Sequence, residues 1–230
     1  MSMNTILMAM SLKNAGIAKI GFINMVGYYG STGKIIYGFG INDIGVSLSS
    51  IPFGDRAYSL WERMISRCYS EKSIARNPTY SDCFVACEMS SFKYFYGMVI
   101  NMTGFSFIDE KGFHYQMDKD LLLKNNRCYS EEFICFIPSE VNNFLLKSNS
   151  IRGDLPIGVS MYEDRVRFKS QIKIGGKKIH IGLFDNEKSA FNAYKEKKEQ
   201  YAKFLANKWA GKIDDRAYQA LMNYKVDETD

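Results

Sequence analysis

The most regular alternation of polar and apolar residues in the chain runs from Arg165 to Ile174, where the sequence reads RVRFKSQIKI. Every second residue is long and polar, and the residues between them are mostly apolar. Because successive side chains of a β-strand point to opposite faces, this pattern predicts a strand with one basic face and one apolar face. The polar positions are Arg165, Arg167, Lys169, Gln171 and Lys173.

Two further strands are predicted on either side of this segment. Residues 158–163 (GVSMYE) form a short first strand, and Glu163-Asp164 turns the chain into the second. Gly175-Gly176 is a strong hairpin signal that leads into a third strand at 177–184. In that strand (KKIHIGLF) the alternation sets Lys178, His180 and Gly182 on one face and Ile179, Ile181 and Leu183 on the other.

A long helix should follow, because Asp185-Asn186 can cap a segment from Glu187 to about Lys208. The apolar side of this helix is expected to cover the sheet and comprises Ala190, Phe191, Ala193, Tyr194, Tyr201, Phe204 and Leu205. The charged outer side comprises Lys188, Lys195, Glu196, Lys198 and Glu199. The opposite face of the sheet, with its cations and His180, is left open, and such a two-sided ribbon suits a DNA major groove.

The earlier part of the chain mixes helices and strands. Ala57–Ser70 has helical spacing, and a second helix is expected from Ser81 or Asp82 through Tyr96. A strand through Tyr115 and Met117, a turn at Asn125-Asn126, a helix from Pro138 and a last helix within 213–224 are also predicted. The predicted fold class is therefore α+β.

Charge is unevenly distributed along the 230 residues, whose formal net charge is +5. Between Leu155 and Trp209 there are 12 Lys and Arg against 6 Asp and Glu, so the rest of the chain is close to neutral. The apolar N-terminus is interrupted by Lys13, Asn14 and Lys19, which argues against a membrane segment. Five cysteines without a secretion signal favour a reduced, cytoplasmic protein. The oligomeric state is left open.

The segment from Leu155 to Trp209 resembles the ethylene-response-factor (APETALA-type) DNA-binding domain, which also occurs in bacteriophage endonucleases. The resemblance is carried by Gly158-Val159, by IGLF at 181–184, and by Ala190 with Ala193-Tyr194. It implies a three-stranded antiparallel sheet packed on one helix and docked in the major groove of double-stranded DNA. The contacts that it implies are Ser160, Gln171, Lys173, Lys178 and His180, to which the alternation adds Arg165, Arg167 and Lys169. Ser160 and His180 stand where arginine and tryptophan are usual, so the target sequence is left open.

Residues 38–224 also resemble the phage HNH-associated endonucleases, through WERMISRCYS, NPTYSDC and the segment 112–143. This resemblance implies a degenerate HNH-like (ββα-type) nuclease core at 53–150, preceded by a glycine-rich segment at 1–52. A linker near 148–156 would lead to the sheet domain at 151–210, and a C-terminal helix and tail would occupy 211–230.

The HNH reaction needs a histidine base, an asparagine and a ligand for a divalent cation. Asp118 keeps its place in the motif, but Lys119 stands where the histidine belongs. His114 is the candidate substitute for this histidine. It lies four residues before Asp118, so on a strand the two side chains would share a face. The candidate catalytic residues are thus His114, Asp118 and Asn126, with Asp118 and Asp120 as ligands of Mg²⁺. The alternative is that these polar residues form and cap a turn, and the core is expected to be impaired as a nuclease.

The cysteines Cys83, Cys87, Cys128 and Cys135 suggest a four-thiolate zinc site, but the spacings are too loose, so buried thiols are expected and zinc is not. The leading hypothesis is a phage-type protein that binds double-stranded DNA. The first alternative is an active Mg²⁺-dependent homing endonuclease. The second is a phage interaction protein that inhibits a host factor, because a basic face also attracts acidic proteins.

Overall fold

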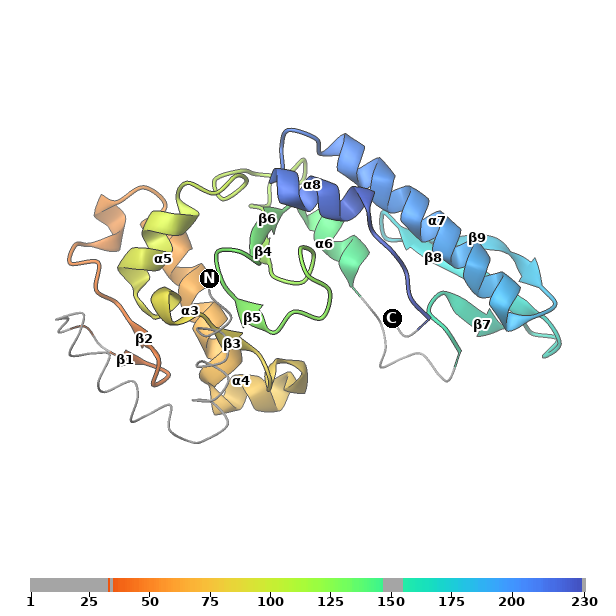
Figure 1. Ribbon diagram of the computed structural model, residues 1–230, viewed down its shortest axis with the longest axis horizontal. Helices are drawn as coiled ribbons and strands as arrows, with labels where there is room; N and C mark the ends of the chain where they lie inside the picture. Colours follow the sequence, from red (N-terminus) through yellow and green to blue (C-terminus); the bar gives the residue numbers. More distant parts are fainter. Residues whose placement is uncertain (1–32, 34, 147–154, 229–230) are drawn as a thin grey trace. The chain divides into compact units, whose positions relative to one another are not determined.

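The computed structural model of the chain describes residues 33, 35–146 and 155–228. The predicted N-terminal segment therefore lies largely outside the described residues, as do most of the predicted linker and the last two residues of the tail. The fold is α+β, as predicted, with helices and short strands along the described chain (Figure 1). Among the described residues, no helix combines the length and the apolarity needed to cross a bilayer.

The chain divides into two compact units. The first takes the described part of Met1–Phe107 together with Met117–Phe136, and the second takes Ile108–Gln116 together with the described part of Ile137–Asp230. The chain passes between the units at three points, and two of them fall within the strands β4 (Gln116–Asp118) and β6 (Cys135–Ile137), which pair with one another. The unit that holds the predicted DNA-binding sheet is thus larger than 151–210.

The first unit is built on helix α3 (Gly54–Tyr69), whose predicted helical spacing is confirmed. Its other elements are β1 (Ile35–Ile36), β2 (Gly40–Ile41), η1 (Leu48–Ser50), α4 (Glu71–Arg76), η2 (Pro78–Tyr80), β3 (Phe84–Val85), η3 (Cys87–Ser90), α5 (Phe92–Val99) and β5 (Cys128–Tyr129). Trp61 of α3 is fully buried, and its indole N–H donates to the carbonyl oxygen of Met89 at 2.8 Å. This core fixes α3 against η3 and α5.

The prediction of a helix starting at Ser81 or Asp82 is wrong. Phe84 and Val85 instead pair in parallel with Cys128 and Tyr129, and α5 begins only at Phe92. Ser91 caps that helix by accepting a hydrogen bond from the backbone N–H of Tyr94 at 3.0 Å. A short apolar run fits a buried strand and a helix equally well, and here the pairing with β5 decides.

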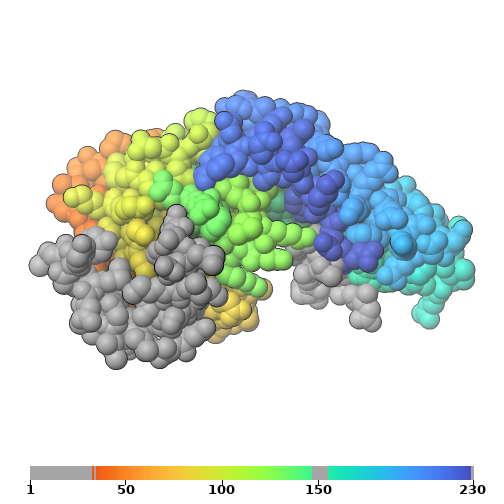
Figure 2. All heavy atoms as spheres, viewed as in Figure 1, coloured from red at the N-terminus to blue at the C-terminus, as the bar shows by residue number. Residues whose placement is uncertain are grey.

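The second unit contains a three-stranded antiparallel sheet, as predicted, in the order β7-β8-β9. The strands are β7 (Val159–Met161), β8 (Phe168–Ile174) and β9 (Lys177–Phe184), and the helices are α6 (Ser139–Leu145), α7 (Glu187–Lys208) and α8 (Asp215–Met222). Helix α7 lies along the sheet in Figure 1, and Figure 2 shows the atoms of α7 and α8 in blue beside those of the sheet in cyan. The predicted cap is confirmed, since the side chain of Asn186 accepts from the N–H of Ser189 at 2.8 Å.

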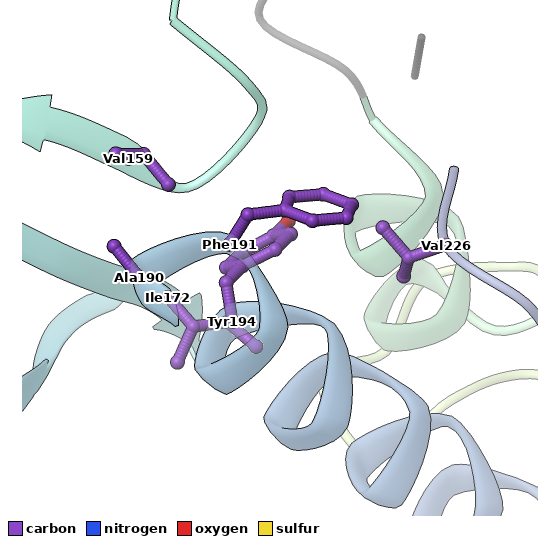
Figure 3. Packing of buried hydrophobic residues seen from close by; sticks show 6 residues of the cluster. All are labelled: Val159, Ile172, Ala190, Phe191, Tyr194 and Val226. Carbon is purple, nitrogen blue, oxygen red and sulfur yellow. The ribbon is translucent and has the colours of Figure 1, made fainter. Parts of the chain in front are cut away.

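The core of this unit lies between the inner face of the sheet and α7 (Figure 3). Its buried residues are Val159, Ile172, Ala190, Phe191, Tyr194 and Val226. Phe168, Ile174 and Ile181 pack against this cluster from the sheet. The burial of one face of the sheet by α7 confirms the predicted arrangement.

Two side chains of α7 do not lie on the side predicted from their residue type. Lys198, expected on the outer side, is only 8% exposed, and its ammonium group donates to the carbonyl oxygen of Phe144 at 2.5 Å. Phe204, expected on the inner side, is 56% exposed. Lys198 lies four residues from both Tyr194 and Ala202, so helical spacing places it on the buried side of α7, where it reaches α6. Glu140 of α6 also accepts hydrogen bonds from Lys208 and Trp209.

Gly158 is required where the sheet approaches the helix most closely. Its φ is +81°, and a Cβ atom at this position would lie 2.0 Å from a ring carbon of Tyr194. We expect Gly158→Ala to lower the free energy of unfolding by about 3–5 kcal/mol, because left-handed strain adds to overpacking. Urea denaturation followed by circular dichroism measures this loss.

The matched control is Gly175→Ala in the hairpin turn, where φ is +57° and no atom lies within 4 Å of the added Cβ. This variant suffers only the backbone strain, about 1–2 kcal/mol. Equal losses in the two variants would contradict the close packing of Gly158 on Tyr194.

Candidate nucleic-acid interface

The register of the sheet brings the predicted contact residues to one face. Lys173 lies opposite Lys178, and Gln171 lies opposite His180. Ser160 lies opposite Lys169 on the other side of β8. Cross-strand partners share a face, and this face is the one turned away from Ile172 and the core. We call the surface formed by Ser160, Lys169, Gln171, Lys173, Lys178, His180 and Leu183 the open face.

Leu183 belongs to the open face because β9 contains a β-bulge. The register shifts between Ser170 and Gln171, so that Ser170 pairs with Gly182 while Gln171 pairs with His180. Ile181 is the extra residue, and it packs against the core. The alternation predicted Gly182 on the open face and Leu183 on the core face, and the bulge exchanges these two assignments. The signal that could have indicated the bulge is Gly182, because an isolated glycine inside a strand is typical of a β-bulge.

The cations of the open face have no internal partner in the described part of the chain. No ion pair and no side-chain hydrogen bond there involves Lys169, Lys173 or Lys178. Lys173, Lys178 and His180 are exposed, while Lys169 and Gln171 are half-buried. Like charges directly opposite one another on a sheet are unfavourable, so an anion bound between Lys173 and Lys178 would relieve their repulsion.

Arg165 and Arg167 lie in the β7–β8 turn, because β8 begins at Phe168 rather than at Arg165. Arg165 has a left-handed backbone, with φ of 54°. The Asp164 carboxylate accepts from the N–H groups of Val166 and Arg167, and from Nε of Arg167 at 2.7 Å. These hydrogen bonds lower the pKa of Asp164 to about 2. The alternation therefore does not extend through the turn, and Arg167 already has a carboxylate partner.

The candidate catalytic residues are divided between the two units. His114 lies in the second unit, is exposed and forms an isolated bridge with Ile108. Strand β4 begins at Gln116, so the expectation that His114 and Asp118 share one strand is wrong. Asp118, Asp120 and Asn126 lie in the first unit.

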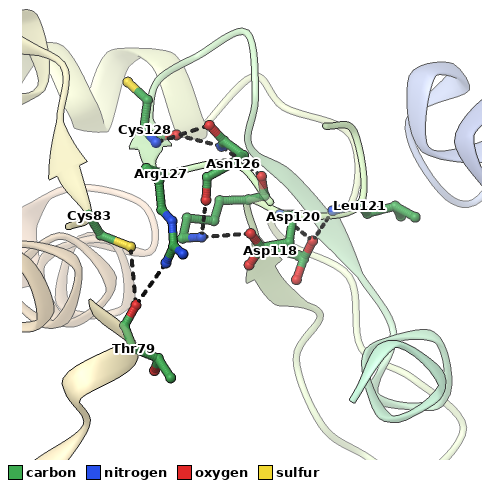
Figure 4. Close-up of polar contacts among 9 residues, drawn as sticks. Thr79, Cys83, Asp118, Asp120, Leu121, Asn126, Arg127 and Cys128 are labelled. Carbon is green, nitrogen blue, oxygen red and sulfur yellow. Dashed lines mark hydrogen bonds and ion pairs between the residues drawn. The ribbon is translucent and has the colours of Figure 1, made fainter. Parts of the chain in front are cut away.

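Within the first unit, the side chains of Asn126 and Lys119 hold the loop between β4 and β5 together. Figure 4 shows the contacts of Asn126. The side-chain amide of Asn126 donates to the carbonyl oxygens of Lys119 and Cys128, and its oxygen accepts from the N–H of Cys128. The ammonium group of Lys119, which is only 6% exposed, donates to Asp120 and to the carbonyl oxygen of Asn126, each at 2.7 Å. Lys119, which stands where the HNH resemblance would place a histidine, thus closes this loop.

Asp118 caps the same loop. One of its carboxylate oxygens accepts from the backbone N–H of Leu121 at 2.7 Å and from that of Asp120 at 3.0 Å. Burial raises the pKa of Asp118 above the ordinary aspartate value, although these hydrogen bonds oppose the shift. The turn-and-cap alternative accounts for the contacts of Asp118 and Asn126 (Figure 4).

The cysteines are thiols rather than disulfides; Cys87 is half-buried, and Cys68, Cys83, Cys128 and Cys135 are buried. Burial raises the pKa of the Cys128 thiol to about 11. In the described ranges, no group of three or more His, Cys, Asp or Glu side chains could hold a metal ion.

We expect Asn126→Ala to lower the free energy of unfolding by about 2–4 kcal/mol, because it removes three hydrogen bonds to buried backbone groups. Thermal or urea denaturation measures the change. The neighbouring control is Asn125→Gly, since Asn125 is exposed with φ of 60°, which glycine adopts without strain. Wild-type stability in Asn126→Ala would show that the amide is not structural and is available for chemistry.

No family model, no curated protein and no solved structure matches this chain. The two resemblances described above stay predictions, and the site is interpreted from its own geometry.

Proposed function

We propose that this chain binds double-stranded DNA and that the open face of the β7-β8-β9 sheet docks in the major groove. The observation that carries the proposal is the pair Lys173 and Lys178. These exposed lysines lie directly opposite one another, and neither has an ion-pair partner in the described residues. A DNA backbone supplies the regularly spaced anions that such an arrangement lacks.

The polar residues divide by position along the sheet. Lys173 and Lys178 lie next to the β8–β9 hairpin turn, and Lys169 lies toward the other end of β8. These lysines are suited to phosphates on either side of a groove, where they supply affinity without reading sequence. Gln171 lies opposite His180, and this pair is located between Lys169 and the Lys173 and Lys178 pair. The side chains of Gln171 and His180 are therefore suited to base edges.

The arginines have different roles in this proposal. Arg167 is engaged by Asp164, and its guanidinium carbon lies 5.3 Å from the centroid of the Tyr162 ring. It therefore stiffens the turn more than it contributes free charge. Arg165 is exposed at the same turn and is the better candidate for a flanking phosphate.

A nuclease reaction gains no support from the loop geometry, because Asp118 and Asn126 are engaged by backbone groups. The Mg²⁺-dependent endonuclease therefore stays an alternative drawn from the resemblance alone. An acidic protein partner would use the same lysines, since attraction to anions does not distinguish phosphate from carboxylate. Binding to purified duplex DNA separates the acidic-partner alternative from the other two.

Replacing both Lys173 and Lys178 with alanine should weaken DNA binding and flatten its salt dependence. Each lost phosphate contact removes about 0.9 from the slope of log affinity against log salt, so the slope should fall by about two. Fluorescence anisotropy with a labelled duplex, titrated at several sodium chloride concentrations, measures both effects.

The charge-matched control replaces Lys197 and Lys203 with alanine, because both lysines are exposed on α7, which covers the opposite side of the sheet. This control should bind DNA nearly as the wild type does. An unchanged slope in a folded Lys173 and Lys178 variant, or an equal loss in the control, would refute the assignment of the open face.

A further inference from the structure

The β-bulge in β9 places an apolar side chain among the DNA-contact candidates. Leu183 lies opposite Lys169, and Lys169 lies opposite Ser160, so these three side chains form one row across the open face. Leu183 is half-buried and is absent from the hydrophobic residues that pack on the core, which include its neighbours Ile181 and Phe184. The open face is therefore not purely polar.

This placement depends on one inserted residue. Without the bulge, period-two alternation would turn Leu183 toward the core with Ile179. With it, Ile181 fills the core position, and Gly182 lies opposite the fully buried Ser170. Bulges commonly re-aim a side chain near a functional surface.

We infer that Leu183 contacts the 5-methyl group of thymine and that Gln171 contacts adenine, so that the open face prefers A·T pairs. This inference rests on the proposed function and deepens it. The thymine methyl is the apolar feature of the major-groove edge, and a glutamine side chain matches adenine N6 and N7 with two hydrogen bonds.

The spacing of the two side chains fits base pairs that are about two steps apart. Lys169 and Gln171 are two residues apart on β8, so Leu183, opposite Lys169, is a diagonal neighbour of Gln171. Diagonal neighbours on a sheet lie about 7–8 Å apart, roughly two base-pair steps of 3.4 Å each. The contacts of Leu183 and Gln171 are thus expected on pairs about two steps apart.

The test compares binding to an alternating dA-dT duplex with binding to the same duplex in which deoxyuridine replaces thymidine. Deoxyuridine keeps every hydrogen-bonding group and lacks only the methyl. The wild-type protein should bind the thymidine duplex about fourfold more tightly for each methyl that Leu183 covers. In Leu183→Ala, checked for folding by circular dichroism, this ratio should fall to about one.

The matched control is Val166→Ala, because Val166 is an apolar residue of the adjoining turn and is 73% exposed. This variant should keep the wild-type preference for thymidine. Equal wild-type affinity for the two duplexes would overturn the inference, and so would a thymidine preference that persists in Leu183→Ala. Equal affinity would leave DNA binding itself intact, whereas no binding to either duplex would overturn the proposed function and this inference with it.

Discussion

The second unit depends on the burial of one face of a three-stranded sheet by a single helix. The contact joins Val159 and Ile172 of the sheet to Ala190, Phe191 and Tyr194 of α7. Gly158 lets the helix approach the backbone of the sheet, because a Cβ atom there would meet the ring of Tyr194. Because α7 covers this face, the other face is left open among the described residues, and its polar side chains are available to the proposed ligand.

The helix itself is held from its other side, which explains why the unit is larger than a sheet and one helix. Lys198 donates to the carbonyl oxygen of Phe144, and Glu140 accepts from Lys208 and Trp209. The C-terminal segment closes the same core: Val226 is buried, and the ammonium group of Lys195 donates to its carbonyl oxygen at 2.8 Å. Elements far apart in sequence thus fix α7, and α7 in turn fixes the inner face of the sheet.

The sequence predicted the features that local chemistry determines. The hairpin at Gly175-Gly176, the bounds of α7 and the Asn186 cap follow from turn, cap and periodicity signals within a few residues. It did not predict features that depend on distant partners. Burial of Lys198 requires a carbonyl oxygen 54 residues away, and β3 forms a strand because of pairing with β5. The bulge is a third case. It exchanges the faces of Gly182 and Leu183, but it depends on how β9 pairs with β8 and not on the sequence of β9 alone.

The two groups of candidate residues differ in what their polar atoms already contact. In the loop from Asp118 to Cys128, side chains of the residue types a nuclease needs are engaged by backbone N–H and carbonyl groups, which gives them a structural role. On the open face, Lys173 and Lys178 are held side by side with no carboxylate between them in the described residues. Side chains that satisfy one another inside the protein stabilise the fold, whereas like charges held together at the surface raise its energy. Within the described residues this arrangement brings no structural benefit, and the proposed binding of an anionic ligand would offset its cost.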